Sequence, residues 1–551
     1  MGTKVKKNWI LILIFLLALF FRLWKLETYP EAIDEDEMAL GYYGYSLSNF
    51  GVDEYGNKFP IYFKSVGDYK YGLYSYAVAP IVKIFGLNTF TTRFPSAVFG
   101  ALSIIAIYFL ALTIFNNKTY ALASSFVLAI NPTHIHFSRV SYGNIMGAFF
   151  TVLAITFFLK FIKSKNIRNF ILTLVPFVLA IFSYQAYRIL IPVIFLTLTI
   201  ILYRQFSKKL LMLLGIVLTT VIISFVPVES RARSQSILTI IDKPALFENA
   251  AEDNSAGTNL LLTRIIHNKI TSFSLDFANR YFSYFDPSFL FLETSITSER
   301  HSIPKVGLIF LIELPILLIS IYAFSKLKKN KLILVPFIML FSAPLASATI
   351  VGVRSITRSV FLVYALSLII GVGFGFLFEQ KKFKKYVIGI LAFLYVGNFI
   401  FFFHQYTVHK IYHHPWNNDV GLKEMVLSIN KTYKDRYQKI VVSRGHYVPF
   451  LFYGKENPND FINKKGIFEK LIFNMPYDCP PTGQKNTLYV CFGYKVPKAG
   501  RIIEVFRYKD GLPAIILVDF NEKQFGPLPK RLEWNEEPSK INLNGNYWPE
   551  N

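Results

Sequence analysis

The feature that most constrains this chain is a series of apolar runs, each close to the length that crosses a membrane. A spanning α-helix needs roughly 17–25 predominantly apolar residues. The runs lie at 8–26, 95–115, 119–133, 142–161, 170–185, 188–203, 210–227, 305–325, 332–351, 357–378 and 386–405. Those that begin at 119, 170 and 188 are short or bounded by proline, which fits tilted, kinked or re-entrant helices. We therefore expect an α-helical polytopic membrane protein with about eleven transmembrane helices.

Composition supports the membrane class. Of the 551 residues, 53% are hydrophobic and 17% are charged, whereas a soluble protein carries about 25% charged residues. The formal net charge of +24 would suggest a nucleic-acid partner in a soluble protein. Here the basic residues form short clusters between apolar runs, as topology signals do. We expect membrane lipids, and no nucleic acid, as partners.

The basic clusters also predict the orientation. With the N-terminus in the cytoplasm, every second connection is basic, as the positive-inside rule requires. These connections contain Lys118; Lys160, Lys163, Lys165 and Arg168; Arg204, Lys208 and Lys209; Lys326, Lys328, Lys329 and Lys331; and Lys381, Lys382, Lys384 and Lys385. The first apolar run follows three lysines but lacks a small-residue cleavage site, which favours a retained signal-anchor. We expect a multi-pass protein of the plasma membrane.

The parts expected outside the cytoplasm are two long loops, at about 27–94 and 228–304, and the chain after about 405. This tail follows an odd number of spans and becomes polar. Its β-like runs at 439–443, 487–492 and 514–520 predict a small extracytoplasmic α/β domain. The expected domains are thus a transmembrane domain, 1–405, and a C-terminal α/β domain, 406–551, whose role the sequence does not indicate.

The two cysteines of the chain, Cys479 and Cys491, both lie in this tail. An extracytoplasmic compartment permits a disulfide between them. Two free thiols fit the sequence equally well.

The first outer loop contains four consecutive carboxylates, Asp34, Glu35, Asp36 and Glu37. Adjacent carboxylates raise one another's pKa by repulsion. Such a cluster can deprotonate a hydroxyl, bind a cation, or simply form a solvated run of charge. These three interpretations remain open at this point.

Four arginines lie at the outer ends of expected spans, where the positive-inside rule does not explain them. They are Arg139, Arg188, Arg354 and Arg358. Arginine at membrane depth is usually paired or functional, and its guanidinium binds phosphate with two hydrogen bonds. A lipid-linked phosphate is therefore a natural partner. The alternatives are contact with lipid headgroups and pairing with the acidic loop.

Together, carboxylates and arginines on one membrane face suit glycosyl transfer from a polyprenyl phosphate. A base activates the acceptor hydroxyl, and cations stabilise charge on the departing phosphate. The sequence shows no phosphate-binding glycine loop and no His-Glu-x-x-His or cysteine pattern for a metal. The pair His134 and His136 is more typical of packing in a loop than of a metal site. We expect no metal and no other cofactor.

An ordered set of motifs resembles the GT-C glycosyltransferases, specifically the protein-O-mannosyltransferase-like and aminoarabinose-transferase-like branch. The matching segments are Asp36–Tyr42, Gly51–Gly56, Gly67–Lys70, Phe85–Leu87, Arg93–Ala97, Asn131–Arg139, Asp286–Phe291 and Arg300–Ser302. The resemblance covers roughly residues 5–405 and is strongest over 30–145.

This resemblance implies roles for individual residues. Asp36 would be the catalytic base on the acceptor side, with Glu37 beside it and Asp34 as its rival. Arg139 would bind the donor phosphate, helped by Arg188, Arg354 or Arg358. Asp68, Lys70 and His301 would bind substrate. The chain lacks the acidic residue that many relatives have near Gly143, and it has Leu292-Glu293 where a glycine is common. These departures bear mainly on which acceptor the protein uses, and less on whether it is active.

The function we expect is that of an inverting glycosyltransferase, hexosyl or pentosyl, acting outside the cytoplasm. It would move one sugar from a polyprenyl-phosphate donor to a protein, a lipid or a glycan of the cell envelope. Two alternatives are a multi-pass lipid or glycan transporter and a non-catalytic assembly partner. A transporter predicts ionisable residues along a path through the membrane, but the expected spans are nearly free of carboxylates apart from Glu313. The sequence does not identify the sugar, the acceptor or the oligomeric state.

Overall fold

The structure, a computed structural model, forms two compact units. It describes residues 8–65, 68–202, 208–225, 243–294, 300–327, 330–350, 354–380, 384–413, 419–443, 446–475, 479–492 and 499–521. The first unit comprises Met1–Trp24, Asp68–Tyr74 and Ser96–Gln405. The second comprises Lys25–Gly67, Ser75–Pro95 and Tyr406–Asn551. A boundary between the two units thus falls near residue 405. Two parts of the first outer loop, however, belong to the same unit as the C-terminal chain. The division into domains 1–405 and 406–551 therefore stays a prediction.

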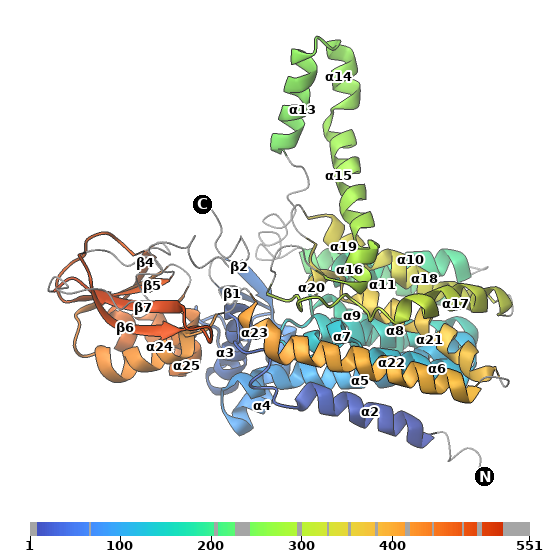
Figure 1. The fold of residues 1–551 in the computed structure, drawn as a ribbon, viewed down its shortest axis with the longest axis horizontal. Helices are drawn as coiled ribbons and strands as arrows, with labels where there is room; N and C mark the ends of the chain where they lie inside the picture. Colours follow the sequence, from blue (N-terminus) through green and yellow to red (C-terminus); the bar gives the residue numbers. More distant parts are fainter. Residues whose placement is uncertain are drawn as a thin grey trace. The chain divides into compact units, whose positions relative to one another are not determined.

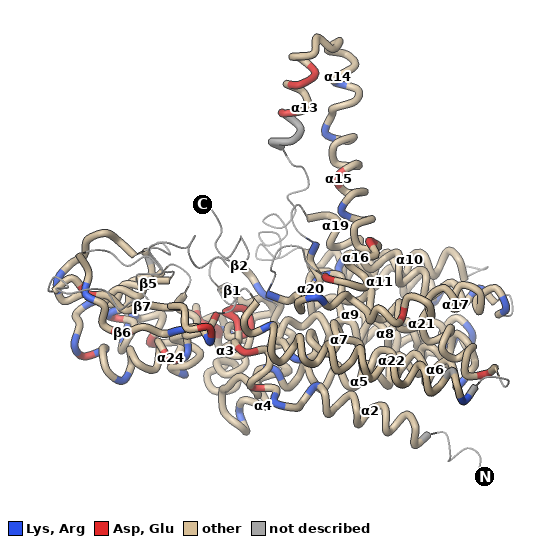
Figure 2. Tube along the Cα trace, viewed as in Figure 1, with Lys and Arg blue, Asp and Glu red and all other residues tan. Residues whose placement is uncertain are grey.

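The first unit is a helical bundle (Figure 1). Its helices are α2 (Asn8–Leu23), α5 (Thr89–Phe115, which begins in the second unit), α6 (Lys118–Ile130), α7 (Pro132–Phe137), α8 (Asn144–Ser164), α9 (Ile167–Ile181), α10 (Tyr187–Leu202), α11 (Lys208–Phe225), α13 (Lys243–Ser255), α14 (Leu260–Ile266), α15 (Lys269–Ser283), α16 (Pro287–Phe291), α17 (Glu313–Lys326), η1 (Lys331–Leu334), α18 (Val335–Ser342), α19 (Leu345–Ala348), α20 (Ile356–Ser359), α21 (Phe361–Glu379) and α22 (Lys384–His404). Charged residues lie mainly near the ends of the bundle helices (Figure 2).

The chain is a multi-pass membrane protein. Among the described residues, six helical stretches are long and apolar enough to cross a membrane. They are Thr89–Phe115, Asn144–Ser164, Lys208–Phe225, Lys331–Ala348, Phe361–Glu379 and Ile388–Tyr412. Each of the runs predicted from the sequence contains a helix, but several are shorter than a full span, so the count of eleven stays a prediction. Helix α5 begins before Pro95 rather than at it, because membrane helices tolerate proline where neighbouring groups satisfy the backbone.

Close packing in the bundle depends on small residues on α21. A Cβ atom placed on Gly371 would lie 2.7 Å from both the Cα and the backbone nitrogen of Ser124 on α6. Gly375, one turn further along, lies against the ring of Tyr120. Small residues of this kind let membrane helices approach closely. Close packing stabilises helix pairs in a membrane, because apolar side chains gain little by leaving lipid for a neighbouring helix. Gly371 and Gly375 therefore set the spacing between α6 and α21.

We predict that Gly371→Ala destabilises the protein by about 1–3 kcal/mol, because the added methyl group meets helix backbone that cannot move aside cheaply. Thermal unfolding of the purified protein in detergent measures the effect. Gly389→Ala on α22 is the matched control, since a Cβ there has no heavy atom within 4 Å. Equal midpoints for the two variants would contradict this account of the packing.

The second unit contains α3 (Glu35–Phe50), β1 (Tyr62–Ser65) and the C-terminal chain, and α4 (Leu73–Phe85) lies largely within it; strand β2 (Asp68–Tyr71) belongs to the first unit. The C-terminal elements are η2 (Gln405–His409, beginning at the last residue of the first unit), α23 (Lys410–Tyr412), α24 (Leu422–Ser428), η4 (Ile429–Tyr433), β3 (Lys439–Ser443), α25 (Val448–Gly454), α26 (Pro458–Ile462), η5 (Gly466–Glu469), β4 (Leu471–Met475), β5 (Thr487–Phe492), β6 (Arg501–Arg507) and β7 (Pro513–Asp519). Strands β3 and β5 have the bounds expected from the sequence, and β7 is displaced by one residue. Strands β4 and β6 and helices α3 and α4 were not expected.

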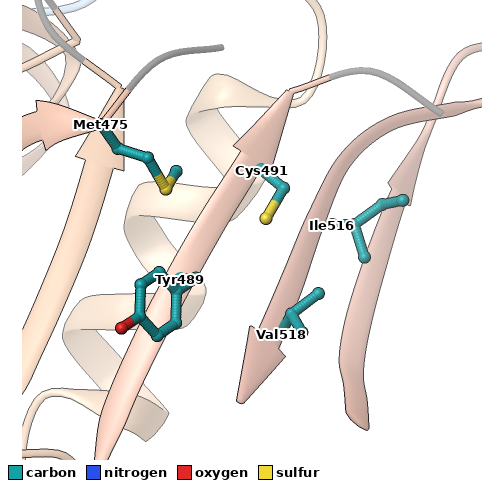
Figure 3. Packing of buried hydrophobic residues seen from close by; sticks show 5 residues of the cluster. All are labelled: Met475, Tyr489, Cys491, Ile516 and Val518. Carbon is teal, nitrogen blue, oxygen red and sulfur yellow. The ribbon is translucent and has the colours of Figure 1, made fainter. Parts of the chain in front are cut away.

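The C-terminal strands form one mixed sheet with the order β4-β3-β5-β7-β6. Strand β3 is parallel to β4 and β5, and β7 is antiparallel to β5 and β6. A cluster of buried side chains packs on this sheet: Met475, Tyr489, Cys491, Ile516 and Val518 (Figure 3). Cys491 forms a disulfide with Cys479, which decides between the two interpretations that the sequence left open.

Candidate functional site

The acidic run of the first outer loop begins helix α3, in the second unit. Asp34 is the N-cap residue, and its carboxylate accepts a hydrogen bond of 2.8 Å from the backbone N–H of Glu37. Capping by aspartate satisfies one of the N–H groups left open at a helix start. The next three carboxylates lie in the first turn, where the helix dipole stabilises negative charge. Because Asp34 is buried and occupied as a cap, it is poorly suited to act as a base.

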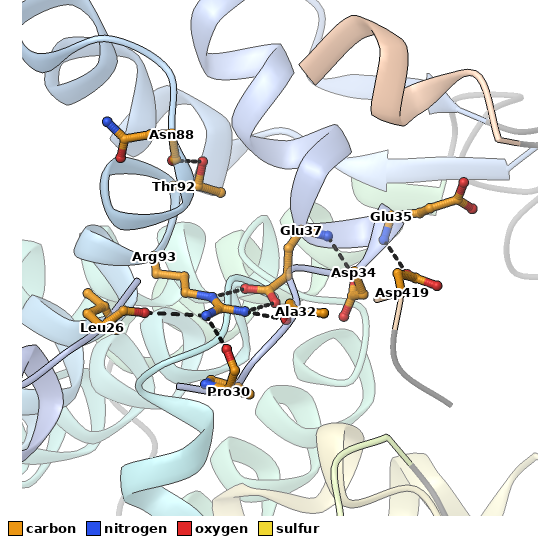
Figure 4. A network of polar contacts seen from close by, with 10 residues as sticks. All are labelled: Leu26, Pro30, Ala32, Asp34, Glu35, Glu37, Asn88, Thr92, Arg93 and Asp419. Carbon is orange, nitrogen blue, oxygen red and sulfur yellow. Dashed lines mark hydrogen bonds and ion pairs between the residues drawn. The ribbon is translucent and has the colours of Figure 1, made fainter. Parts of the chain in front are cut away.

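Glu37 forms a buried ion pair with Arg93 of α5 (Figure 4). The guanidinium donates two hydrogen bonds of 3.0 Å, from Nε to Oε2 and from Nη2 to Oε1. Its remaining donors reach the backbone oxygens of Leu26, Pro30 and Ala32 at 3.3, 2.9 and 2.7 Å. Glu37 and Arg93 are 1% and 0% exposed. The pair thus fixes the chain before α3 onto the start of α5. The role of Glu37 in this structure is to balance the charge of Arg93.

Glu35 is held by residues of the C-terminal chain, within the same unit. Its backbone N–H donates to Oδ2 of Asp419 at 3.0 Å, and its carboxylate lies 2.7 Å from Nδ1 of His446. The His446 ring stacks on Phe492 with 4.2 Å between ring centroids. Tyr447 donates to Glu54, and Tyr42 of α3 donates to the backbone oxygen of Glu456 at 2.9 Å. Helix α3 is therefore held by α5 through the Glu37–Arg93 pair and by residues of the C-terminal chain.

Asp36 is the exposed member of the acidic run. Asp34 and Glu37 are buried and Glu35 is half-buried, whereas the side chain of Asp36 faces the surface of the unit. The cap, the ion pair and the His446 contact hold the turn that carries it. Of the three catalytic candidates, Asp36 alone combines a fixed backbone with an accessible carboxylate.

Arg139 lies in the first unit, after α7, and is 1% exposed. Its guanidinium donates to the backbone oxygens of Phe21 and Trp24 at 2.6 and 2.7 Å. Arg22 lies beside this contact and is fully buried; it contacts Nδ1 of His134 at 2.6 Å and the backbone oxygen of Ala129 at 3.1 Å. The two arginines hold the end of α2 against α6 and α7. His134 packs inside this network, on a helix rather than in the expected loop.

The other three arginines lie in the same unit, and two of them have clear partners there. Arg188 is 3% exposed, and its guanidinium lies 4.6 and 4.7 Å from the ring centroids of Tyr71 and Phe225. Arg354 donates to the backbone oxygen of Ser283 at 3.0 Å. Arg358 lies on α20, half-buried, and its Nε has no hydrogen-bond partner among the described residues.

Asp286 lies near Arg354, with 3.7 Å between its Oδ2 and the guanidinium. The pKa of Asp286 is lowered, mainly because its carboxylate accepts a hydrogen bond from the backbone N–H of Ser288. The hydrogen bond with the Ser288 side chain and the nearby charge of Arg354 also lower this pKa. This carboxylate, which caps α16, was part of a matching motif but was not among the expected site residues.

Two of the expected substrate-binding residues, Lys70 and His301, lie next to or against residues that neighbour or contact two of these arginines. Lys70 lies on β2 next to Tyr71, the residue that contacts Arg188. The His301 ring lies 4.8 Å from Tyr142 and 5.7 Å from Phe137, so it packs on the segment that carries Arg139. Asp68 also lies on β2, but its side chain is outside the described part of the structure.

Arg93 is the residue that the sequence analysis missed. It stood inside a matching segment, but no role was assigned to it. Its signal was available: an arginine at the start of an apolar run, close to an acidic loop, is usually paired.

Residues 12–228 match the family described as dolichyl-phosphate-mannose-protein mannosyltransferase. This range includes the acidic run, Arg93, Arg139 and Arg188. No curated protein matches the chain by sequence.

Several solved structures share the fold. ArnT from Cupriavidus metallidurans in the apo state is 11% identical, with a TM-score of 0.53, over 95% of this chain and 100% of that chain. The same enzyme bound to undecaprenyl phosphate gives 10% identity and a TM-score of 0.53 over 96% and 99%. The oligosaccharyltransferase from Archaeoglobus fulgidus, in complex with Zn and sulfate, gives 13% identity and a TM-score of 0.51 over 88% and 68%.

The chain spans 65% of the length of the oligosaccharyltransferase AglB from Archaeoglobus fulgidus in its complex with an inhibitory peptide and a dolichol-phosphate. At these identities the structural likeness establishes the fold alone.

The expected resemblance to the GT-C glycosyltransferases of the protein-O-mannosyltransferase-like and aminoarabinose-transferase-like branch is confirmed, by the family match over residues 12–228 and by the likeness in fold to ArnT.

We predict that Glu37→Gln lowers the free energy of unfolding by about 3–5 kcal/mol, because it leaves the buried Arg93 guanidinium without its counter-charge. Denaturation of the purified protein in detergent measures this loss. Glu248→Gln, at an exposed glutamate of α13, is the matched control and leaves stability unchanged. The double variant Glu37→Leu/Arg93→Met loses less than Glu37→Gln, since it removes both charges; a loss as large or larger would count against the ion pair.

Proposed function

We propose that the chain is an inverting glycosyltransferase that moves one hexosyl or pentosyl group from a polyprenyl-phosphate donor to an acceptor on the extracytoplasmic face of the membrane. The observation that carries this proposal is the division of roles within the acidic run. Asp34 caps α3 and Glu37 neutralises Arg93, while Asp36 stays exposed on the same rigid turn. A carboxylate held in this way suits a general base.

In the proposed reaction, Asp36 accepts the proton of the acceptor hydroxyl. The acceptor oxygen attacks the anomeric carbon on the side opposite the phosphate, and a new glycosidic bond forms as the bond to the phosphate oxygen breaks. The polyprenyl phosphate leaves with the bonding electron pair. A single displacement of this kind inverts the anomeric configuration.

On the donor side, cations would stabilise the charge on the departing phosphate. Arg139 is the first candidate, and Arg188, Arg354 or Arg358 would help it. Arg188 lies over the rings of Tyr71 and Phe225, and the Nε of Arg358 has no partner among the described residues. Asp68, Lys70 and His301 would contact the sugar or the phosphate. The complex of ArnT with undecaprenyl phosphate supports a lipid-linked donor.

The proposal includes a topology of about eleven spans with the N-terminus in the cytoplasm. The mixed C-terminal sheet would then lie outside, as an extracytoplasmic α/β domain from about residue 406. The Cys479–Cys491 disulfide supports this side of the membrane, since such bonds persist in oxidising compartments. The acceptor would be a protein, a lipid or a glycan of the cell envelope.

We predict that Asp36→Asn lowers turnover by about 100-fold or more, the usual contribution of a general base. Purified protein in lipid is incubated with a panel of radiolabelled polyprenyl-phosphate sugars, and release of the sugar is measured. Glu27→Gln, at an exposed glutamate of the same loop, retains activity. Full activity of Asp36→Asn would remove this residue from the mechanism. Lipid transport by the wild type, with no turnover of any donor, would favour a transporter instead.

We further propose that the reaction needs no metal ion, because arginines supply the positive charge at the phosphate. Dialysis against EDTA leaves wild-type turnover within about twofold, since guanidinium groups keep their charge at any working pH. Adding Mg²⁺, Mn²⁺ or Zn²⁺ back gives no large increase. A loss of activity on chelation that one of these ions restores would overturn metal independence without affecting the role of Asp36.

A further inference from the structure

Helices α13, α14 and α15 form an arm that leaves the helical bundle of the first unit. In Figure 1 the arm runs across the direction of α2, α5 and α22. Since α5 and α22 lie in stretches long and apolar enough to cross a membrane, an arm that runs across them has the direction of the membrane plane. The arm is therefore oriented like a helix that rests on a bilayer.

Helix α15 has one apolar face and one polar face. Four apolar residues follow helical spacing along one side: Ile270, Phe273, Phe277 and Tyr281. Ser272, Asp276 and Asn279 lie on the other side, Lys269 and Arg280 border the apolar face, and the apolar Leu275 and Phe282 lie toward the side of Asn279. Within the described structure, α15 has no buried residue, and Ile270, Leu275 and Phe282 are 77%, 65% and 66% exposed. Water is an unfavourable environment for this face.

Helix α14 extends the apolar surface. Leu260, Leu261 and Ile265 are 64%, 71% and 62% exposed, and Leu262 and Ile266 are each 48% exposed. Arg264 and Lys269 are interspersed with these side chains and are exposed as well. An apolar face bordered by basic residues is typical of helices that lie in the lipid–water interface.

The apolar surface of the arm continues onto a surface that faces lipid. The hydroxyl of Tyr281 donates to the backbone oxygen of Phe341 at 2.7 Å, and the rings of Phe285 and Phe341 lie 5.8 Å apart. Phe341 is 55% exposed on the span Lys331–Ala348. Arg280 donates to the backbone oxygen of Ala348, at the end of that span. The base of the arm is thus fixed at the membrane boundary.

We propose that α14 and α15 lie in the interface of the outer leaflet. Their apolar side chains enter the acyl-chain region, and Arg264 and Lys269, which are both exposed, reach the phosphates of lipid headgroups. The partner is a phospholipid surface, because the exposed apolar surface covers both helices and merges with the lipid-facing side of a span. This binding mode is independent of the transfer reaction.

The test compares two positions on α15 that are both exposed and lie nine residues apart, Ile270 and Asn279. At 3.6 residues per turn they point in opposite directions. Single-cysteine variants Ile270→Cys and Asn279→Cys of the full chain, whose two native cysteines are joined in a disulfide, are labelled with an environment-sensitive fluorophore. The labelled proteins are placed in vesicles of phosphatidylglycerol and phosphatidylethanolamine.

Spin-labelled lipids quench the label at Ile270→Cys at least about threefold more than that at Asn279→Cys, and aqueous iodide shows the reverse order. Equal access of iodide to both labels would overturn the proposal. A label at Ile270→Cys that neither quencher reaches would also overturn it, in favour of a protein contact. Cross-linking between copies through Ile270→Cys would identify that contact as a second copy of the chain.

Discussion

The ion pair between Arg93 and Glu37 is the interaction on which the acidic loop depends. Burying a guanidinium away from water is costly unless its donors are engaged and its charge is paired. Here a carboxylate takes two donors and three backbone oxygens take the rest. Because those oxygens belong to the chain just before α3, the pair fixes both the helix and the segment that leads into it.

This arrangement separates four neighbouring carboxylates by environment. One caps the helix, one balances Arg93, one contacts His446, and Asp36 stays exposed. Residues of one chemical type, adjacent in sequence, thus acquire different roles because a helical turn points them in different directions. The rigidity of Asp36 comes from its neighbours and not from burial of its own side chain.

Much of the fold could be predicted from the sequence, because hydrophobic length and basic connections are local signals. Each predicted span contains a helix, and β3 and β5 were placed to the residue. Helix α3 was missed because its glycines and aromatic residues obscure a helical pattern. Strand β6 was missed because Arg501, Glu504 and Arg507 interrupt its apolar pattern. The sequence predicted the types of residue at the candidate site but not their contacts. The partners of Glu37 and Glu35 lie 56 and 384 positions away, so no local pattern indicates them.

The separation between Glu35 and Asp419 has a consequence for biosynthesis. Helix α3 leaves the ribosome early, yet the residues that hold its first turn follow 384 positions later. At about 5–20 residues per second, this interval lasts about 20–80 s. During that time the acidic turn lacks its C-terminal contacts and the second unit is incomplete. A nascent chain therefore assembles its membrane helices first, and the acidic turn acquires its final form only when synthesis is nearly finished.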